Sequence, residues 1–155
     1  MRSVIAETYG GPEALRIVDA PLPIPAPDQV LVRVAASSVN PLDTHELTGR
    51  PYLVRIVRGL RAPKPDGRAM GSDIAGVVEA VGDQVTRFAV GDRVVGFGRA
   101  AWSELTAVTE SGLVRLPEGV PLVDAGGVGV AAITALQGLR RGGLVGPATW
   151  GPGEV

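Results

Sequence analysis

The chain has 155 residues, of which 45% are hydrophobic and 20% are charged, and its formal net charge is −1. This length suits one domain with a sizeable core and is too short for two full α/β domains. The charge balance gives no overall field that would attract nucleic acid or an anionic membrane. The chain has no cysteine, which excludes disulfides, cysteine zinc sites and cysteine nucleophiles and suits a cytoplasmic protein.

No targeting or membrane-spanning segment is predicted. The N-terminal residues lack the apolar core of a signal peptide. The longest apolar run covers residues 125–136 and is shorter than the roughly 20 residues that cross a bilayer. We therefore expect a cytoplasmic protein with no membrane partner and no nucleic-acid partner.

The first two thirds of the sequence predict short strands separated by turns. A Gly-Gly-Pro turn at residues 10–12 favours an antiparallel pair on either side of it. The proline-rich stretch over 21–27 predicts an extended connector, because proline cannot donate to a ladder. Several short strands at regular spacing indicate a β-barrel or sandwich. In chain order, the predicted strands cover residues 3–8, 14–19, 29–39, 74–81, 93–97, 102–108 and 113–116.

Two segments have helical character. Residues 51–60 carry hydrophobic side chains at helical spacing, with Pro51 in the first turn, so we predict an amphipathic helix with Arg55 and Arg58 on its polar face. Residues 121–139 predict a second helix, which their glycines weaken or split in two.

The second helical segment contains Gly127-x-Gly129-x-x-Ala132, a match to the loop that cradles a dinucleotide pyrophosphate. Such a loop needs a buried strand directly before it and an acidic residue about 20 positions later to bind the ribose. Neither is present, since residues 116–124 contain two prolines and the nearest acid, Glu154, lies in a glycine- and proline-rich tail. A connector helix whose small residues permit close packing is the favoured interpretation.

The sequence resembles one family over about residues 1–145. Residues 36–49 and 71–98 look like the GroES-like catalytic domain of the medium-chain dehydrogenase/reductase superfamily, in its zinc-independent quinone-oxidoreductase-like branch. The strongest marker is the spacing of Gly76-Val-Val-Glu-x-Val-Gly82, then Val85, Phe88 and Gly91-Asp92-x-Val94.

The resemblance implies a mainly β fold: a GroES-like, partly open β-barrel with a few short helices and a C-terminal connector helix. We expect the substrate domain over residues 1–118, the connector helix region over 119–141 and an irregular tail over 142–155. The resemblance also implies NAD(P)H as cofactor, held by a Rossmann domain that follows in the family and is absent here. The isolated chain is therefore expected to bind NAD(P)H weakly and to lack activity.

The resemblance places the candidate site at residues 40–45. Asn40 would orient a substrate carbonyl or the nicotinamide ribose, since its side chain both donates and accepts. Asp43 would hold the turn or a ribose hydroxyl, and His45 would donate a proton near neutral pH. Simple turn chemistry at Asn40 and a surface or core-edge histidine at position 45 are the structural alternatives. Tyr52 and Arg55 are expected to line the substrate site.

No metal is predicted. Zinc-dependent relatives place a cysteine where Asn40 stands and a His-Glu pair where Ser72-Asp73 stands, and amide and hydroxyl groups are poor zinc ligands. A basic stretch has no aromatic residue interleaved with its cations beyond Tyr52, which argues against nucleic-acid binding. It is interpreted as a solvated face, with a rim that attracts an anionic substrate or a cofactor phosphate as the alternative. Its cations are Arg50, Arg55, Arg58, Arg61, Lys64 and Arg68.

Two functions of different class follow. The first is the substrate-binding domain of a zinc-free NAD(P)H-dependent oxidoreductase that acts on quinones, enones or similar carbonyls. The alternative is a free-standing binding or interaction module, or a degenerate remnant without catalysis. Exposed apolar surface next to an absent domain predicts self-association.

Overall fold

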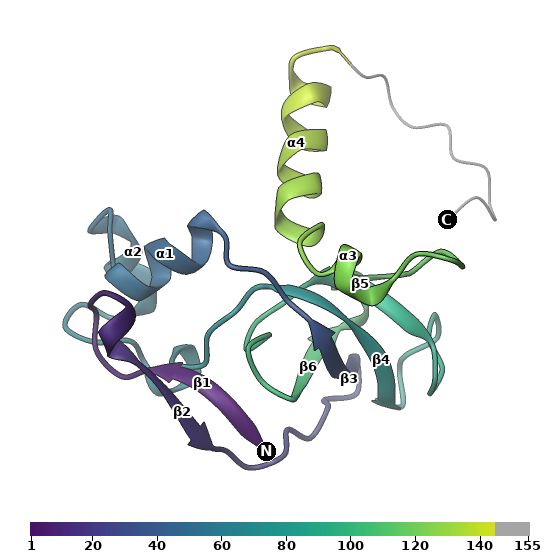
Figure 1. Ribbon diagram of the computed structural model, residues 1–155, viewed down its shortest axis with the longest axis horizontal. Helices are drawn as coiled ribbons and strands as arrows, with labels where there is room; N and C mark the ends of the chain where they lie inside the picture. The colour runs from purple at the N-terminus through teal and green to yellow at the C-terminus, as the bar shows by residue number, and fades with distance from the viewer. Residues whose placement is uncertain (145–155) are drawn as a thin grey trace.

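The computed structural model describes residues 1–144, which form two antiparallel sheets with helices above them (Figure 1). The predicted tail over 142–155, with Trp150, lies almost wholly outside the described residues. The strands are β1 (Arg2–Ala6), β2 (Leu15–Asp19), β3 (Gln29–Ala36), β4 (Asp73–Val81), β5 (Arg93–Phe97), β6 (Leu105–Thr109) and β7 (Leu113–Arg115). The α-helices are α1 (Pro41–Thr48), α2 (Leu53–Arg58), α3 (Leu122–Ala125) and α4 (Gly129–Arg141), and short 3₁₀ turns cover Pro12–Ala14, Pro65–Gly67 and Glu110–Gly112.

The larger sheet has the strand order β6-β3-β4-β5-β7, and β1 and β2 form a separate hairpin. Single bridges from Ser3 to Ser103 and from Ile5 to Ala69 attach this hairpin to the segments before β6 and β4. The sheets do not close on themselves. The mainly β, partly open architecture predicted from the sequence is confirmed.

The main core lies on the inner face of the larger sheet. Val30 and Val32 are fully buried there, as the alternation of the third strand predicts. Leu31 points to the opposite face and is also buried. Near the Ala36 end of β3, α3 packs on the larger sheet, and Ala125 joins Ala75 and Val95 in a second cluster.

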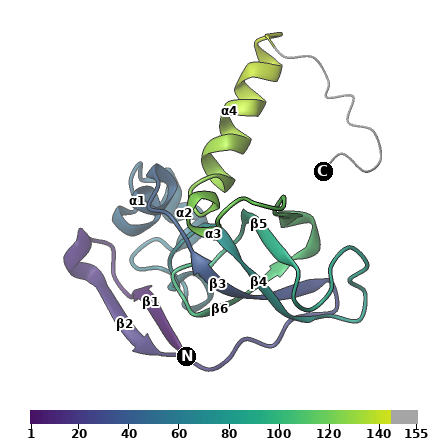
Figure 2. The ribbon, with the colours of Figure 1, turned by 45° about the vertical axis from the view of Figure 1, so that its right-hand side comes forward.

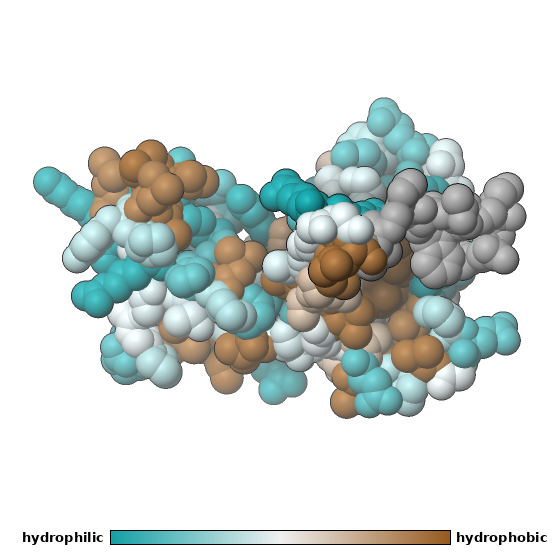
Figure 3. Space-filling model, turned by 90° about the horizontal axis from the view of Figure 1, so that it is seen from above, coloured by the Kyte–Doolittle hydropathy of each residue, from teal (hydrophilic) through white to brown (hydrophobic). Residues whose placement is uncertain are grey.

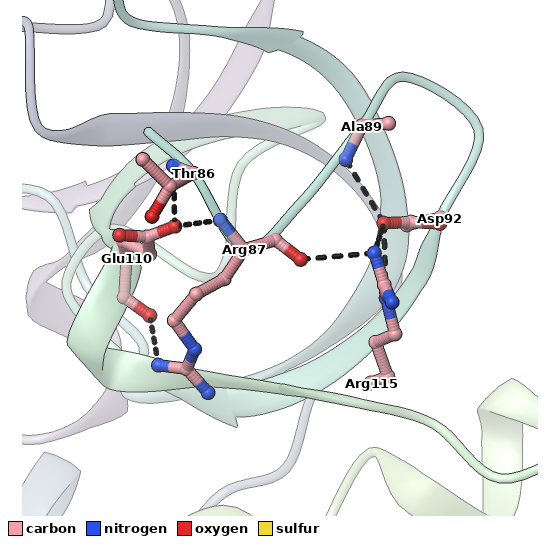
Figure 4. A network of polar contacts seen from close by, with 6 residues as sticks. All are labelled: Thr86, Arg87, Ala89, Asp92, Glu110 and Arg115. Carbon is pink, nitrogen blue, oxygen red and sulfur yellow. Dashed lines mark hydrogen bonds and ion pairs between the residues drawn. The ribbon is translucent and has the colours of Figure 1, made fainter. Parts of the chain in front are cut away.

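Two carboxylates fix the loop between β4 and β5 against β7 (Figure 4). Glu110 accepts hydrogen bonds from the backbone amides of Thr86 and Arg87. Asp92 accepts one from the amide of Ala89 at 2.9 Å and forms an ion pair with Arg115 at 2.8 Å. This loop buries Phe88, whereas Val90 is 67% exposed.

Helix α2 forms where a helix is predicted, but its faces are reversed. Arg58, predicted on the polar face, is only 8% exposed, whereas Ile56 and Val57 are 65% and 68% exposed. The apolar spacing marks a helix correctly and does not say which side faces the protein. On the side that faces the protein, Arg58 pairs with Glu46 of α1 at 2.9 Å.

The predicted helix over 121–139 is split at residues 126–128 into α3 and α4. Helix α3 lies on the sheet, and α4 extends away from it in both ribbon views (Figures 1 and 2). Most of α4 is therefore exposed, including Ile133, Leu136 and Leu139. No helix within residues 1–144 is long and apolar enough to span a bilayer.

Candidate functional site

The predicted site begins at the N-terminus of α1. Asn40 is the N-cap residue, and its Oδ1 accepts hydrogen bonds from the amides of Leu42 at 2.9 Å and Asp43 at 3.3 Å. The Asp43 carboxylate accepts a return bond from the Asn40 amide at 2.9 Å, which completes a capping box. Pro41 at the first helical position needs no partner for an amide. This segment is therefore a rigid helix start and not an open turn.

Asp43 is buried beneath this cap. It is 1% exposed, and its second oxygen accepts a hydrogen bond from the Ser72 hydroxyl at 2.9 Å. Burial raises the pKa of the Asp43 carboxyl above its usual range, against the opposite effect of the bonds from Asn40 and Ser72. Both oxygens of the Asp43 carboxylate thus accept hydrogen bonds from the protein, and the bond from the Asn40 amide helps to hold Asn40 in place.

Asp73 joins this cap to α4. It is 1% exposed, and its Oδ2 accepts hydrogen bonds from the Ser38 hydroxyl and from Asn40 Nδ2, the latter at 3.2 Å. Its Oδ1 accepts one from the backbone amide of Val130 at 2.6 Å, in the first turn of α4. A carboxylate is favoured there because helix N-termini carry unpaired amides and partial positive charge. Asp73 therefore sets the Asn40 side chain and the α4 N-terminus relative to each other.

The glycine motif at residues 127–132 lies at the contact between Asp73 and the N-terminus of α4. A Cβ on Gly129 would overlap the carbonyl oxygen of Gly96 and lie 2.7 Å from Asp73 Oδ1. A Cβ on Gly127 would meet only Ser38, at an ordinary 3.7 Å. Gly129 thus permits close packing against Gly96. The Val130 amide, in the first turn of α4, donates to the Asp73 carboxylate. These contacts support the connector interpretation of the motif.

Two pockets adjoin the network. A pocket of about 130 Å³ lies beside Ser72 and is lined by Leu42, Glu46, Phe97, Gly98 and Arg99. A larger, almost wholly apolar pocket of about 530 Å³ lies between α1 and the β1–β2 hairpin. Its lining includes Val4, Leu15, Val39, Thr44, Leu47 and Trp102.

Asn40 and Asp43 contact each other in the structure, whereas His45, Tyr52 and Arg55 lie apart from them. His45 is exposed on α1. Tyr52 is 68% exposed beside α2. The Arg55 guanidinium lies over the rings of Tyr9 and Tyr52, at 4.5 and 5.1 Å from their centroids, and donates to the Gly49 carbonyl at 3.2 Å. Arg55 therefore ties α2 to the end of α1.

Sequence reasoning missed the ion pair between Glu46 and Arg58. Arg58 also donates to the Gly67 carbonyl at 2.7 Å, while its Nε is buried without a partner among the described residues. Burial raises the pKa of the Glu46 carboxyl, and the charge of Arg58 acts in the opposite direction. The two residues are 12 positions apart in sequence, and no local motif announces their pairing.

The residues that stand at the zinc-ligand positions of zinc-dependent relatives do not fit a metal. Asn40 and Ser72 offer an amide and a hydroxyl, and both are hydrogen-bonded to carboxylates. Within residues 1–144, no three His, Asp or Glu side chains gather closely enough to hold a metal ion. The absence of zinc stays a prediction.

A partly open antiparallel sheet, a capped helix after its first long strand and a connector helix together define a GroES-like domain. Residues 26–118 match the alcohol dehydrogenase GroES-like domain. The chain belongs to this family, within the zinc-independent, quinone-oxidoreductase-like branch of the medium-chain dehydrogenase/reductase superfamily.

Three comparisons illustrate the relationship. A quinone oxidoreductase from Pseudomonas aeruginosa is 41% identical over 135 residues, which cover 86% of this chain and 38% of the relative. The crystal structure of Pseudomonas syringae quinone oxidoreductase is 35% identical with a TM-score of 0.80, covering 95% of this chain and 43% of that one. Escherichia coli quinone oxidoreductase complexed with NADPH is 25% identical with a TM-score of 0.79, covering 92% and 41%. The chain thus spans about two fifths of the length of these relatives.

Proposed function

We propose that the chain forms the substrate-binding part of a zinc-free, NAD(P)H-dependent oxidoreductase that acts on quinones, enones or similar carbonyls. The likeness to quinone oxidoreductases and to one complexed with NADPH supports this proposal. The observation that carries it is the fixed Asn40 side chain. One N–H of its amide donates to Asp73, which leaves the second to donate to a substrate carbonyl or a cofactor hydroxyl.

A bound NAD(P)H would supply the hydride, and the chain's own residues would position the acceptor. A donor held by three hydrogen bonds loses little freedom when it binds a developing oxyanion. His45, exposed on the same helix, would return a proton to the reduced product. The isolated chain is expected to bind NADPH weakly and not to oxidise it with a quinone.

An NMR titration with a fully methylated benzoquinone tests the proposal. We expect amide shifts around residues 38–45 and 98, and about fivefold weaker binding in Asn40→Ser, which keeps the capping oxygen but loses the amide donor. Ser111→Ala, an exposed hydroxyl elsewhere, is the control. Shifts confined to Val4, Leu15 and Trp102, which line the 530 Å³ pocket but lie outside residues 38–45, together with equal affinity in Asn40→Ser, would contradict the role of Asn40. Robust NADPH oxidation by the chain alone would contradict the expected need for a separate cofactor domain.

A second function, an interaction module, is favoured by one specific observation. An apolar groove of about 370 Å³ lies between α4 and the edge formed by β5 and β7. Side chains from both sides line it, including Phe97, Val114, Ile133 and Leu136. Such a surface suits another polypeptide, and its occupancy is tested by the oligomeric state of the chain.

A further inference from the structure

Helix α2 presents its hydrophobic side chains to solvent. We define the α2 patch as the five residues of this segment that are each 65–72% exposed. Their hydrophobic side chains gather over the end of the molecule formed by α1 and α2 (Figure 3). Exposed hydrophobic residues are common singly, but a contiguous group on one helix indicates an interaction site. The members of the α2 patch are Tyr52, Leu53, Ile56, Val57 and Leu60.

This orientation is fixed by contacts on the opposite side of the helix. Arg58 is buried between Glu46 and the Gly67 carbonyl, at 2.9 and 2.7 Å. Arg55 is held between two tyrosine rings and by the Gly49 carbonyl. Burying an arginine while exposing isoleucine, valine and leucine is unfavourable in a molecule surrounded only by water. The arrangement becomes favourable when an apolar phase covers the α2 patch.

The charges around the α2 patch indicate what that phase is. Arg50, Arg61 and Lys64 flank the helix in sequence, are exposed, and form no ion pair with any residue in the described part of the chain. The neighbouring exposed acid is Asp66. Hydrophilic side chains also border the hydrophobic cluster in Figure 3. The net charge of −1 for the whole chain therefore conceals a local excess of positive charge.

We propose that the α2 patch docks on the surface of a membrane that carries anionic lipid headgroups. The leucine, isoleucine and valine side chains enter the boundary of the acyl region, and the flanking cations meet the headgroups. Tyr52 has the amphipathic ring typical of this interface. The helix lies on the surface and does not span the bilayer. This inference does not depend on the proposed reaction.

A second copy of the chain fits the patch less well. A two-fold contact between α2 patches brings the same surface together twice. It would place Arg50, Arg61 and Lys64 of one copy near the identical cations of the other, and like charges at close range repel. Anionic headgroups neutralise these charges instead.

Co-sedimentation with lipid vesicles tests the inference. We expect the 155-residue chain to bind vesicles in which about a third of the lipid is phosphatidylglycerol, and to bind pure phosphatidylcholine vesicles at least about tenfold more weakly. Ile56→Ser/Val57→Ser and, separately, Arg61→Gln/Lys64→Gln should each weaken binding about tenfold. Added salt should weaken wild-type binding and have less effect on Arg61→Gln/Lys64→Gln.

Matched controls separate the patch from general surface properties. Ile24→Ser/Val90→Ser removes two side chains that are 90% and 67% exposed elsewhere, and Arg16→Gln/Arg99→Gln removes two other exposed cations. Both should bind like wild type, and circular dichroism should show all variants folded. Equal binding to neutral and anionic vesicles, no binding at all, or an equal loss in the controls would overturn the inference. A lipid-free dimer that only Ile56→Ser/Val57→Ser abolishes would also overturn it, in favour of a second copy.

Discussion

At the scale of single residues, Asp73 is the side chain on which the candidate site depends most. Its carboxylate accepts bonds from Ser38, Asn40 and the Val130 amide, and it is 1% exposed. Asp73→Asn keeps the shape but replaces one acceptor oxygen with a donor, which leaves at least one buried donor unpaired. We expect a loss of about 2 kcal/mol in the free energy of unfolding, measured by urea denaturation.

Measurements at two of the donors to Asp73 test its role more directly than the overall stability of Asp73→Asn does. The bonds from Asn40 and from the Val130 amide both lose the negative charge of the carboxylate, and one of them also loses its acceptor oxygen. Hydrogen exchange of the Val130 amide should therefore accelerate, and the Asn40 side-chain amide resonance should shift. Asp83→Asn, in an exposed turn, should change neither. An Asp73→Asn protein with wild-type stability and unchanged Val130 exchange would show that the carboxylate does not hold α4.

The same residues show which contacts of the candidate site can be predicted from the sequence and which cannot. The Asn40-to-Asp43 spacing is a local capping signal, so this pair is accessible from sequence, as is the likeness that points to Asn40. The bond from Asn40 to Asp73 spans 33 positions and the pair of Glu46 with Arg58 spans 12, across two helices. Only the tertiary arrangement creates such contacts, and no periodicity encodes them.

Glu46 makes stability depend on pH. Burial raises the pKa of the Glu46 carboxyl above the ordinary value of 4.5. At pH values between the unfolded and the folded pKa, the folded chain therefore keeps a proton that the unfolded chain has lost. The stabilisation is full below the unfolded value and is lost as the pH rises through the folded value. The stability of Glu46→Gln relative to wild type should therefore increase from about pH 4 to about pH 7, on top of a cost from the lost pair with Arg58 that does not depend on this titration. Urea denaturation at both pH values measures this, with exposed Glu118→Gln as control; a difference that does not change with pH would contradict it.

At the scale of elements, the strands follow from the sequence because alternation and turn residues are local. The predicted strand over 93–97 is β5 residue for residue, and the predicted 74–81 strand begins one residue earlier, at Asp73. Helix α2 shows the limit of pattern reasoning, because its apolar stripe is real but faces outward. The buried Glu46–Arg58 pair and the tyrosine contacts lie on the inward side of this helix, and neither belongs to any hydrophobic pattern.

Two glycines of α4 should respond in opposite directions to the same substitution. Gly129→Ala forces a methyl group against the Gly96 carbonyl and Asp73, so we expect α4 to lose about 1–3 kcal/mol of local stability. Gly138 has no atom within 4 Å of an added Cβ, so Gly138→Ala should gain about 0.5–1 kcal/mol from helix propensity alone. Hydrogen exchange along α4 measures both. Equal effects at the two positions would refute the close packing at Gly129.

At the scale of the whole molecule, the chain has a packed β-rich body and one helix that extends from it (Figure 2). Helix α4 carries Ile133, Leu136 and Leu139, 40–46% exposed, beside the groove of about 370 Å³. Within residues 1–144, nothing covers this groove. The relatives are more than twice as long as the matched region, and this apolar surface is the one that we propose above as an interaction site.

In the 155-residue chain, that surface should drive self-association through α4, because burying apolar area is favourable and the two-fold contact meets no opposing charge along these side chains. Sedimentation velocity at roughly tens of micromolar should show dimers or larger species. Ile133→Ser/Leu136→Ser should shift the population to monomer, whereas Ala131→Ser/Ala135→Ser on the same exposed helix should not. Since the α2 patch is a separate surface, Ile56→Ser/Val57→Ser should leave this association unchanged. A monodisperse wild-type monomer would contradict association through this surface, and the argument for a polypeptide partner there would fail.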